Sequence, residues 1–425
     1  MASKENRATR HEGDLWAMLQ LFKKRSQFRR LVLGNLVSQL GEWLSYIAVS
    51  LLTVSSGEGG IALATAYLAH TLPNALVAPL SGRVADRFDR RLIMLSTYAI
   101  ASLITALMMM SAWRGQIWLL QGLTAVRTAV NSFGQTARQA SVPSLVAPEE
   151  LYTANALISL TWSTQFALGV AMGGVLAALF GPTSAIGIDA ITFVIAIFTI
   201  WGLPSLRPQK ESLPPLSTER EMGLSTQTKL NELDERSGLW AAWTAARLHP
   251  KLMAALLSKC PLGISNSAGW MVLTIHATLG SSSRGGLTLG AFHLMRAIGT
   301  GIGPLIFKSV WPKSAITSTL FSVFAIIGLL HSPSYWVSVV CLLSWGGLLG
   351  YTWVRSSATI QELAPSSVLG RLGAFELSCT TLSQGFSILF IGWMFDLGFG
   401  LAIPVYLMAI ITLLTGGWLL RLEKF

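Results

Sequence analysis

The sequence is a series of long apolar runs separated by short stretches in which the charged residues collect. About 20 apolar residues cross the hydrocarbon core of a bilayer as a helix. Charged residues make up only 12% of the 425 residues, whereas an ordinary soluble protein has about 25%. The runs are continuous and do not alternate with polar residues, which excludes a transmembrane β-barrel. The sequence therefore predicts an all-α polytopic membrane protein.

Twelve runs are long enough to be transmembrane helices. They cover approximately residues 31–55, 60–81, 91–113, 116–137, 153–180, 183–203, 252–280, 286–307, 314–332, 335–355, 372–396 and 399–420. The long polar interval 204–250, which is rich in proline at its start, divides six runs from six. We therefore expect two six-helix bundles joined by a linker. The predicted parts are a tail (1–30), a bundle (31–203), the linker (204–250), a second bundle (251–421) and a tail (422–425).

The distribution of Lys and Arg predicts how the chain is oriented. If the spans alternate in direction, 26 of the 31 basic residues fall on the side of the N-terminus, and only Arg114 and Arg284 fall on the opposite side. The positive-inside rule then places both termini in the cytoplasm. This asymmetry accounts for the formal net charge of +11 without a nucleic-acid partner. Residues 15–23 are expected to form a surface helix that lies against the membrane.

Motifs for other classes of protein are missing from the sequence. Cys260, Cys341 and Cys379 lie in or at apolar runs, with no CxxC and no His at ligand spacing, so we expect neither structural disulfides nor a metal site. The phosphate-binding pattern GxxxxGK[ST] does not occur, and no GxSxG has plausible triad partners. We therefore expect a protein that is not an enzyme and carries no cofactor.

The two halves of the sequence show a weak internal repeat. Arg138 corresponds to Arg355, and Ala147-Pro148 corresponds to Ala364-Pro365, at the same offset of 217 residues. Both pairs surround the predicted turn between the fourth and fifth span of their half. Repeated bundles of this kind favour a transporter whose substrate site lies near the bilayer midplane.

The turn after the second span carries the most specific motif. Residues 82–91 read Gly82-Arg83-Val84-Ala85-Asp86-Arg87-Phe88-Asp89-Arg90-Arg91. This turn resembles the G-x-L-A-D-R-x-G-R-R signature of the major facilitator superfamily, except that Val84 replaces Leu and Asp89 replaces Gly. The resemblance implies the major facilitator fold, and it implies that Gly82, Asp86, Arg87, Arg90 and Arg91 form a conformational latch between the bundles. The alternative is a basic loop that only stops translocation.

Other segments resemble the branch of that superfamily that contains the enterobactin exporter and macrolide-efflux-like permeases. These segments include residues 39–43, 137–140 and 188–190. In the fifth span, Gly169, Gly173 and Gly174 match the antiporter motif G-x-x-x-G-P-x-x-G-G, although Gln165 and Val170 replace its first Gly and its Pro. This resemblance implies proton-coupled export. The alternative is that these glycines serve only helix packing.

Several ionisable residues lie inside predicted spans, where a charge is costly unless it faces a cavity or a partner. Glu42, Arg127, Asp189 and Arg296 are the candidates for substrate binding or coupling. Glu42 and Arg127 could instead form a structural ion pair, Asp189 could be a helix-packing carboxylate, and Arg296 could reach the surface. The aromatic residues of the spans could line a cavity for an amphipathic solute; they include Trp43, Tyr67, Trp162, Phe166, Trp270 and Trp345.

These patterns predict a secondary active transporter that moves a small amphipathic or hydrophobic molecule by alternating access, as proton-coupled export. Its partners would be the substrate, protons and the lipid bilayer, and we expect a monomer in a bacterial-type inner membrane. Two alternatives remain open. One is a lysophospholipid or lipid-like flippase, and the other is a non-transporting membrane scaffold or sensor with the same fold.

Overall fold

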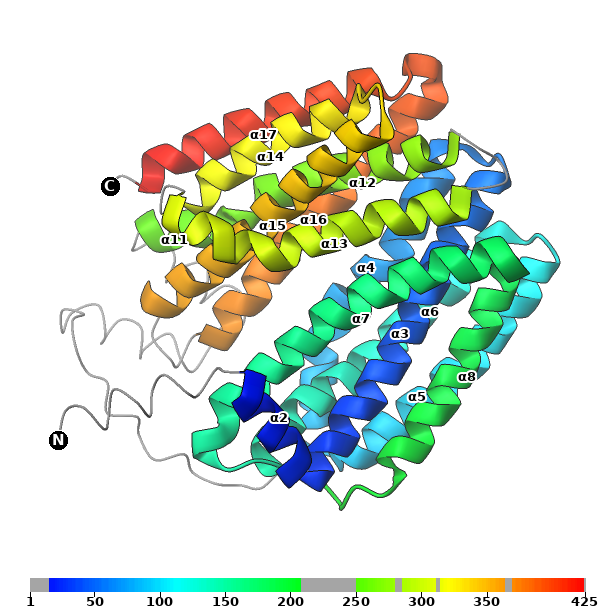
Figure 1. The fold of residues 1–425 in the computed structure, drawn as a ribbon, viewed down its shortest axis with the longest axis vertical. Coiled ribbons are helices and arrows are strands. Elements are labelled where there is room, and N and C mark those ends of the chain that lie inside the picture. Colours follow the sequence, from blue (N-terminus) through cyan, green and yellow to red (C-terminus); the bar gives the residue numbers. More distant parts are fainter. Residues whose placement is uncertain (1–14, 208–249, 280–284, 311–313, 364–368, 424–425) are drawn as a thin grey trace. The chain divides into compact units, whose positions relative to one another are not determined.

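The structure is a computed structural model that describes residues 15–207, 250–279, 285–310, 314–363 and 369–423. In that part of the chain every regular element is a helix (Figure 1), which confirms the all-α fold class. Most of the predicted linker and the first half of the N-terminal tail lie outside the described residues.

Each predicted span corresponds to one helix, or to two for the seventh span, and most bounds differ by a few residues. The first half contains α2 (Leu15–Lys24), α3 (Ser26–Ser55), α4 (Gly59–Ala85), α5 (Arg90–Trp113), α6 (Ile117–Ser141), η1 (Val142–Ser144), η2 (Pro148–Glu150), α7 (Leu151–Phe180) and α8 (Pro182–Trp201). The second half contains α11 (Pro250–Leu257), α12 (Lys259–Leu279), α13 (Gly285–Val310), α14 (Ala315–Leu330), α15 (Tyr335–Leu363), α16 (Leu369–Met394), η3 (Phe395–Phe399) and α17 (Ala402–Glu423). The seventh predicted span is therefore made of two helices, α11 and α12, that are interrupted at Ser258.

Among the described residues, seven helices are both long and apolar enough to cross a membrane. The helices α3, α6, α12 and α13 are long enough but are not among the seven. Two of them, α3 and α6, carry polar residues in their middle. Glu42 lies on α3, and Arg127 and Asn131 lie on α6. Polar residues within transmembrane helices almost always face the interior of a bundle or a cavity. These two helices are therefore where a polar site is expected.

The chain divides into two compact units. The first consists of Met1–Pro208 together with Thr274–Ala297, and the second consists of Gln209–Leu273 together with Ile298–Phe425. The five-part division expected from the sequence stays a prediction.

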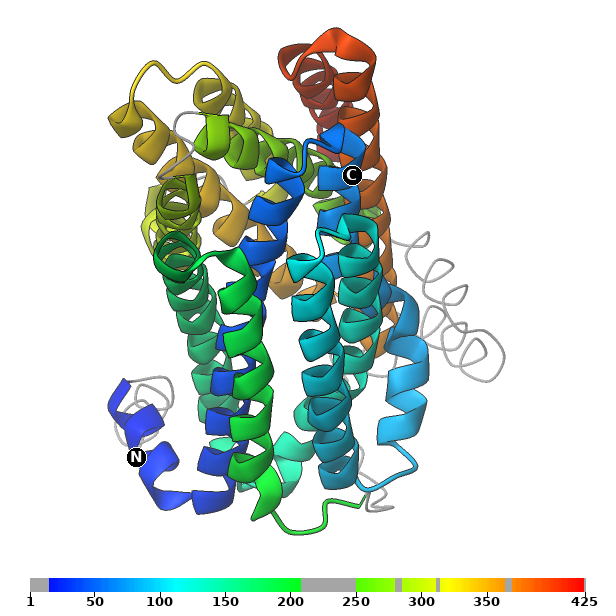
Figure 2. The ribbon, with the colours of Figure 1, turned by 90° about the vertical axis from the view of Figure 1, so that its right-hand side faces the viewer.

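In the first unit, α3 packs against α7 and α8, and α6 packs against α4 and α5. The helices α3 to α8 run side by side along the unit (Figures 1 and 2). Two apolar clusters fill its interior at different levels. One includes Leu31, Met94 and Phe193, and the other includes Met108 and Ile186. The two clusters include Leu31 and Ala48 on α3, Ala137 and Leu120 on α6, and Phe193 and Ile186 on α8, respectively. The polar residues of these three helices lie between those positions, so they form a layer between two apolar regions.

Leu15–Lys24 form the separate helix α2 before the first span, and its position against the membrane stays a prediction. Met18 and Leu21 are buried, whereas Trp16 and Leu19 are exposed. At the following bend, Lys24 and Arg25 form ion pairs with Glu150 at 3.1 and 2.8 Å. These ion pairs join the N-terminal helix to the turn η2, which is 125 residues further along the chain.

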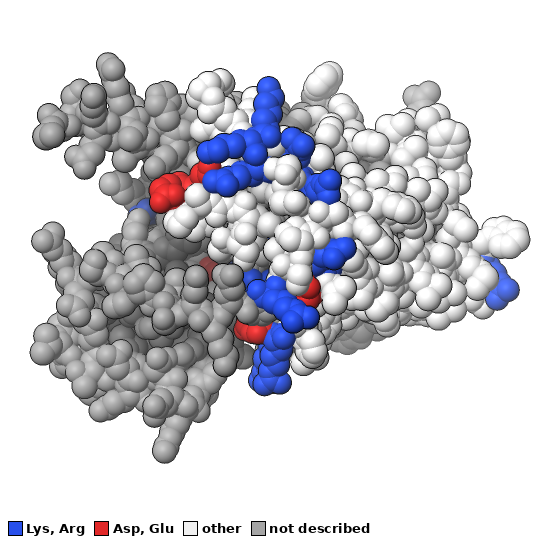
Figure 3. All heavy atoms as spheres, turned by 90° about the horizontal axis from the view of Figure 1, so that it is seen from below, with Lys and Arg blue, Asp and Glu red and all other residues white. Residues whose placement is uncertain are grey.

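Exposed basic residues gather at the end of the first unit that carries α2 and the turn between α4 and α5. They include Lys23, Lys24, Arg30, Arg83 and Arg87. Figure 3 shows the face seen from below, on which Lys and Arg are concentrated. The second unit is built around α14, which packs against α15 and α17, and α11, which packs against α15, α16 and α17.

Candidate functional site

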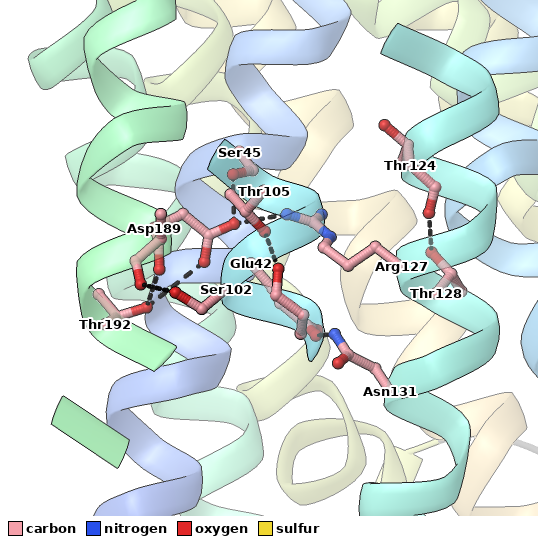
Figure 4. Close-up of polar contacts among 12 residues, drawn as sticks. Glu42, Ser45, Ser102, Thr105, Thr124, Arg127, Thr128, Asn131, Asp189 and Thr192 are labelled. Atoms are coloured by element: carbon pink, nitrogen blue, oxygen red, sulfur yellow. Dashed lines mark hydrogen bonds and ion pairs between the residues drawn. The ribbon is translucent and has the colours of Figure 1, made fainter. Parts of the chain in front are cut away.

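The polar layer of the first unit brings together residues from α3, α6 and α8 (Figure 4). Its strongest interaction is an ion pair between Arg127 Nη1 and Asp189 Oδ2, which lie 2.5 Å apart. The Arg127 side chain is 1% exposed and the Asp189 side chain 0%. Taking two charges out of water costs several kcal/mol for each, and only good geometry with additional hydrogen bonds compensates for that cost.

The carboxylate of Asp189 has those additional hydrogen bonds. The hydroxyl of Ser45 donates to Oδ2, and the hydroxyl of Thr192 donates to Oδ1 over 3.4 Å. Three helices thus converge on one carboxylate. The polar interactions of Asp189 therefore fix α3, α6 and α8 relative to one another.

Gly41 allows this convergence. A Cβ atom built on Gly41 would overlap the hydroxyl of Thr192 and the carboxylate of Asp189. The backbone of α3 can approach α8 this closely only where the side chain is a hydrogen atom. Gly41 directly precedes Glu42, so the same close approach also positions Glu42 in the layer.

Glu42 has neutral partners. Asn131 Nδ2 donates to Glu42 Oε1, and Gln39 Nε2 donates to Oε2 over 2.7 Å. Glu42 is partly exposed, unlike Arg127 and Asp189. Glu42 is therefore the carboxylate of this layer that solvent or a substrate can reach.

The structure thus brings together three of the four predicted substrate or coupling residues, but in a different pairing from the one the sequence suggested. The sequence left open a structural ion pair between Glu42 and Arg127. In the structure Arg127 forms its ion pair with Asp189 instead. Ser45, Asn131 and Thr192 were not among the residues that the sequence indicated, and Gln39 was indicated only as part of the segment 39–43. Helical spacing could have identified these residues, because residues three or four apart share one face of a helix. Gln39 and Ser45 are each three residues from Glu42, and Asn131 is four residues after Arg127.

Aromatic side chains of the first unit gather beside this layer. The ring of Trp43 is 4.5 Å from that of Phe166, and Trp162 stacks on Phe166 at 5.9 Å. The rings of Tyr46 and His70 are 4.8 Å apart. Arg296, the fourth predicted residue, lies with its Cζ 5.2 Å from the centroid of the Phe166 ring, so it contacts the aromatic cluster. Trp270 and Trp345, which the sequence grouped with these residues, belong to the second unit.

The three glycines of the antiporter-like motif each lie at a close helix contact. A Cβ on Gly169 would be 2.5 Å from Trp43 Cβ, and one on Gly173 would be 3.1 Å from Ile47 Cβ. A Cβ on Gly174 would be 2.9 Å from the Cα atom of Gly290 on α13. Close packing of α7 against α3 and α13 therefore needs these glycines, whatever their role in coupling.

In the turn between α4 and α5, Gly82 lies in the last turns of α4, and no atom lies within 4 Å of a Cβ built there. Asp86 follows the end of α4, and both Asp86 and Arg87 are exposed. Arg90 donates to the carbonyl oxygens of Ala85 and Ala140 over 3.2 and 2.7 Å. Arg91 donates to the carbonyl of Trp201 over 2.6 Å. These guanidinium groups therefore interact with the carbonyl ends of α4, α6 and α8, where the helix dipole favours positive charge.

Asp89 stands where the signature has Gly, and the structure shows why Asp is tolerated. Its φ angle is −61°, so no glycine is needed there, and its side chain caps α5 by accepting from the Arg91 backbone N–H over 2.9 Å. It also accepts from the Ser205 hydroxyl at 2.6 Å and the Leu206 N–H at 3.0 Å. Partial burial alone would raise the pKa of Asp89, but these hydrogen bonds, together with one from the Leu92 N–H, outweigh that effect and lower the pKa below its ordinary value.

The second unit contains another ion pair within its helices. Lys259 Nζ lies 2.8 Å from Glu376 Oε1. Ser356 donates to the same carboxylate oxygen over 3.0 Å. Among the described residues, no group of three or more His, Cys, Asp or Glu side chains is arranged to hold a metal ion.

Comparison with known proteins gives a consistent result. The model of the Major Facilitator Superfamily matches residues 31–375. Macrolide efflux protein A of Streptococcus pyogenes is 24% identical over 369 residues, which are 84% of this chain and 86% of that protein. Enterobactin exporter EntS of Citrobacter koseri is 24% identical over 377 residues, which are 83% of this chain and 82% of that protein.

Among solved structures, the fold is similar to that of a D-xylose-proton symporter. The TM-score is 0.70 at 11% sequence identity, and the match covers 93% of this chain and 96% of the symporter chain. At this identity the similarity concerns the fold alone.

Proposed function

Because the chain belongs to the Major Facilitator Superfamily, we propose that it is a proton-coupled exporter of a small amphipathic or hydrophobic molecule that works by alternating access. The family and the transporters among its relatives make the chain an integral membrane transporter and not an enzyme, as the sequence suggested. The substrate class, the coupling ion, the direction and the position in a bacterial inner membrane with cytoplasmic termini are parts of the proposal.

The observation that carries the proposal is the charge balance of the polar layer. Two carboxylates, Glu42 and Asp189, share the layer with one guanidinium, Arg127. A net negative charge between two apolar clusters is costly. The next buried cation along α6, Arg138, lies seven residues after Asn131, which is roughly two helical turns. A proton bound to Glu42 makes the three-residue layer neutral.

Accessibility supports Glu42 as the residue that binds this proton. It is the partly exposed carboxylate of the layer, whereas Asp189 is completely buried and ion-paired. Its two amide partners can adapt to either protonation state, because an amide group carries both a donor and an acceptor. Asp189 and Arg127 then act as the fixed scaffold of the site.

The aromatic cluster supports an amphipathic substrate. Trp43, Phe166 and Trp162 offer apolar ring faces next to the polar layer, and Arg296 adds a cationic group over the ring of Phe166. A binding site of this type holds the apolar body of a ligand by packing and orients its polar groups by hydrogen bonds. The names of two relatives, an efflux protein and an exporter, support outward transport.

One observation favours the second candidate, a lipid-like flippase. An open groove of about 420 Å³ lies between α4 and α6. Its walls are almost entirely apolar and include Leu68, Leu72, Leu76 and Trp118. An acyl chain fits such a groove better than a polar solute does.

The test is a flux assay in proteoliposomes with an imposed pH gradient and a panel of amphipathic solutes, siderophores and lysolipids. We expect flux of one solute class that follows the gradient and is lost with a protonophore. In Glu42→Gln the response to the gradient should disappear while substrate still equilibrates. Glu58→Gln, which alters an exposed carboxylate at the start of α4, is the matched control and should behave like the wild type.

Each rival predicts a different result. Glu42→Gln with a normal gradient response would contradict the coupling role of Glu42. Lipid flux that is insensitive to protonophores would select the flippase. Ligand-dependent thermal stabilisation without any flux would select the scaffold or sensor.

A further inference from the structure

The helices α12 and α16 of the second unit pack closely along a seam of polar contacts. The hydroxyl groups on each helix donate to backbone carbonyls of the other, an arrangement that holds helices together in an apolar environment. These contacts are the Lys259–Glu376 ion pair at 2.8 Å, the bond from Ser267 Oγ to Gln384 O at 3.0 Å and the bond from Ser387 Oγ to Ile264 O at 3.0 Å.

A glycine marks the closest approach within this seam. A Cβ built on Gly263 would lie 2.8 Å from the carbonyl oxygen of Thr380 and 3.1 Å from Gln384 Cγ. Such a distance is shorter than real Cβ contacts, so the two backbones meet here at a separation that only glycine permits.

Two of the three cysteines lie at this approach. Cys260 directly follows Lys259 and is one turn before Gly263, and Cys379 directly precedes Thr380. On both helices the cysteine thus lies between the residues of two contacts, the Lys259–Glu376 ion pair and the close approach of Gly263 to Thr380. Both residues are free cysteines with partly exposed side chains. A disulfide requires Cα atoms about 4.4–6.8 Å apart, a separation that only closely packed helices provide.

We propose that Cys260 and Cys379 form an oxidisable dithiol, which a peroxide converts into an intramolecular disulfide that joins α12 to α16. The reduced pair is the resting state. The inference depends on the packing of the second unit alone and is independent of the proposed transport function.

The chemistry is a two-electron oxidation. One cysteine attacks the O–O bond of the peroxide as a thiolate and becomes a sulfenic acid, with release of water. The second thiolate attacks the sulfenic sulfur, and the S–S bond forms as a second water leaves. In total, two thiols and one hydrogen peroxide give one disulfide and two waters. A dithiol reductant reverses the reaction by thiol–disulfide exchange.

The test counts thiols in the purified full-length chain by maleimide mass labelling after denaturation. Before oxidation the chain should carry three reactive thiols, which equals its number of cysteines. After treatment with hydrogen peroxide, only Cys341 should remain labelled, and a peptide that links Cys260 to Cys379 should be present until reductant is added. In Cys341→Ser the count should fall to zero.

Substitutions of each cysteine and of two glycines on the same helices supply the controls. Cys260→Ser or Cys379→Ser should abolish the linked peptide. Gly263→Leu forces the helices apart and should slow disulfide formation several-fold, whereas Gly373→Leu on α16, where an added Cβ has no atom within 4 Å, should not. Three labelled thiols after oxidation would overturn the proposal. So would loss of the Cys341 thiol instead of the other two, or disulfides that form only between separate chains.

Discussion

Arg127 on α6 and Asp189 on α8 form an ion pair of 2.5 Å in which neither side chain is more than 1% exposed. Because Asp189 takes this guanidinium, Glu42 is left with the neutral amides of Asn131 and Gln39. A buried ion pair is inert as long as it stays intact, whereas a carboxylate with neutral partners can gain or lose a proton with little rearrangement. The pairing therefore divides the layer into a fixed part and a titratable part.

Removing one charge of the Arg127–Asp189 ion pair should cost more stability than removing both charges together. Asp189→Leu leaves Arg127 buried without its partner and should destabilise the fold by about 3–5 kcal/mol. The double variant Asp189→Leu with Arg127→Met removes both charges and should recover much of that loss. Thermal unfolding in detergent, followed by tryptophan fluorescence, measures both. A double variant no more stable than Asp189→Leu would contradict this account.

Gly41 should tolerate no side chain. In Gly41→Ala the new methyl group collides with Thr192 and Asp189, so α3 must move away from α8 and the polar layer is disrupted. We expect a lower unfolding temperature and loss of transport. Gly122→Ala on α6, where an added Cβ has no atom within 4 Å, is the matched control and should resemble the wild type. Equal behaviour of the two variants would show that α3 and α8 are not packed this closely.

Asp86 should be essential to transport but not to folding. Its side chain is exposed after the end of α4, so Asp86→Asn removes a charge without creating a cavity. If residues 82–91 act as a latch, this variant should insert into membranes at normal levels and lose flux. Wild-type flux in Asp86→Asn would refute the latch and leave a loop that only stops translocation.

The contact between α2 and η2 should depend on pH. Burial raises the pKa of Glu150, but hydrogen bonds from Arg25, the Ala147 N–H and Lys24 outweigh it and lower the pKa from 4.5 to about 2. Because the folded-state pKa is the lower one, the contribution of Glu150 is complete above pH 4.5. This contribution declines as the pH falls from 4.5 toward 2, and it is lost below about pH 2.

Spin labels on the exposed residues Leu19 and Ser144 measure this contact as a distance distribution. We expect a narrow distribution at pH 7, a broader one as the pH falls from 4.5 toward 2, and a broad one at pH 7 in Glu150→Gln. Glu149→Gln, which alters the exposed neighbouring carboxylate, should stay narrow. A narrow distribution in Glu150→Gln would mean that apolar packing of Met18 and Leu21 holds α2 without the ion pairs.

The sequence was sufficient for the helices because their cause is local. Each span needs only a run of apolar residues about as long as the bilayer is thick, and each predicted run corresponds to a helix in the structure. The sequence also indicated which side chains were out of place in those runs, namely Glu42, Arg127 and Asp189. Membership of the superfamily could be anticipated as well, because residues 82–91 form one contiguous segment.

The tertiary structure alone decided which of these residues meet. Arg127 and Asp189 are 62 residues apart in the chain, and Cys260 and Cys379 lie on helices from opposite ends of the second half. No spacing rule relates such positions, because the rotation of each helix and the depth of each contact come from packing against its neighbours. Small residues such as Gly41 and Gly263 then set how closely two helices approach. The distance between the helices determines whether a charged side chain can form an ion pair and whether two thiols lie close enough to form a disulfide.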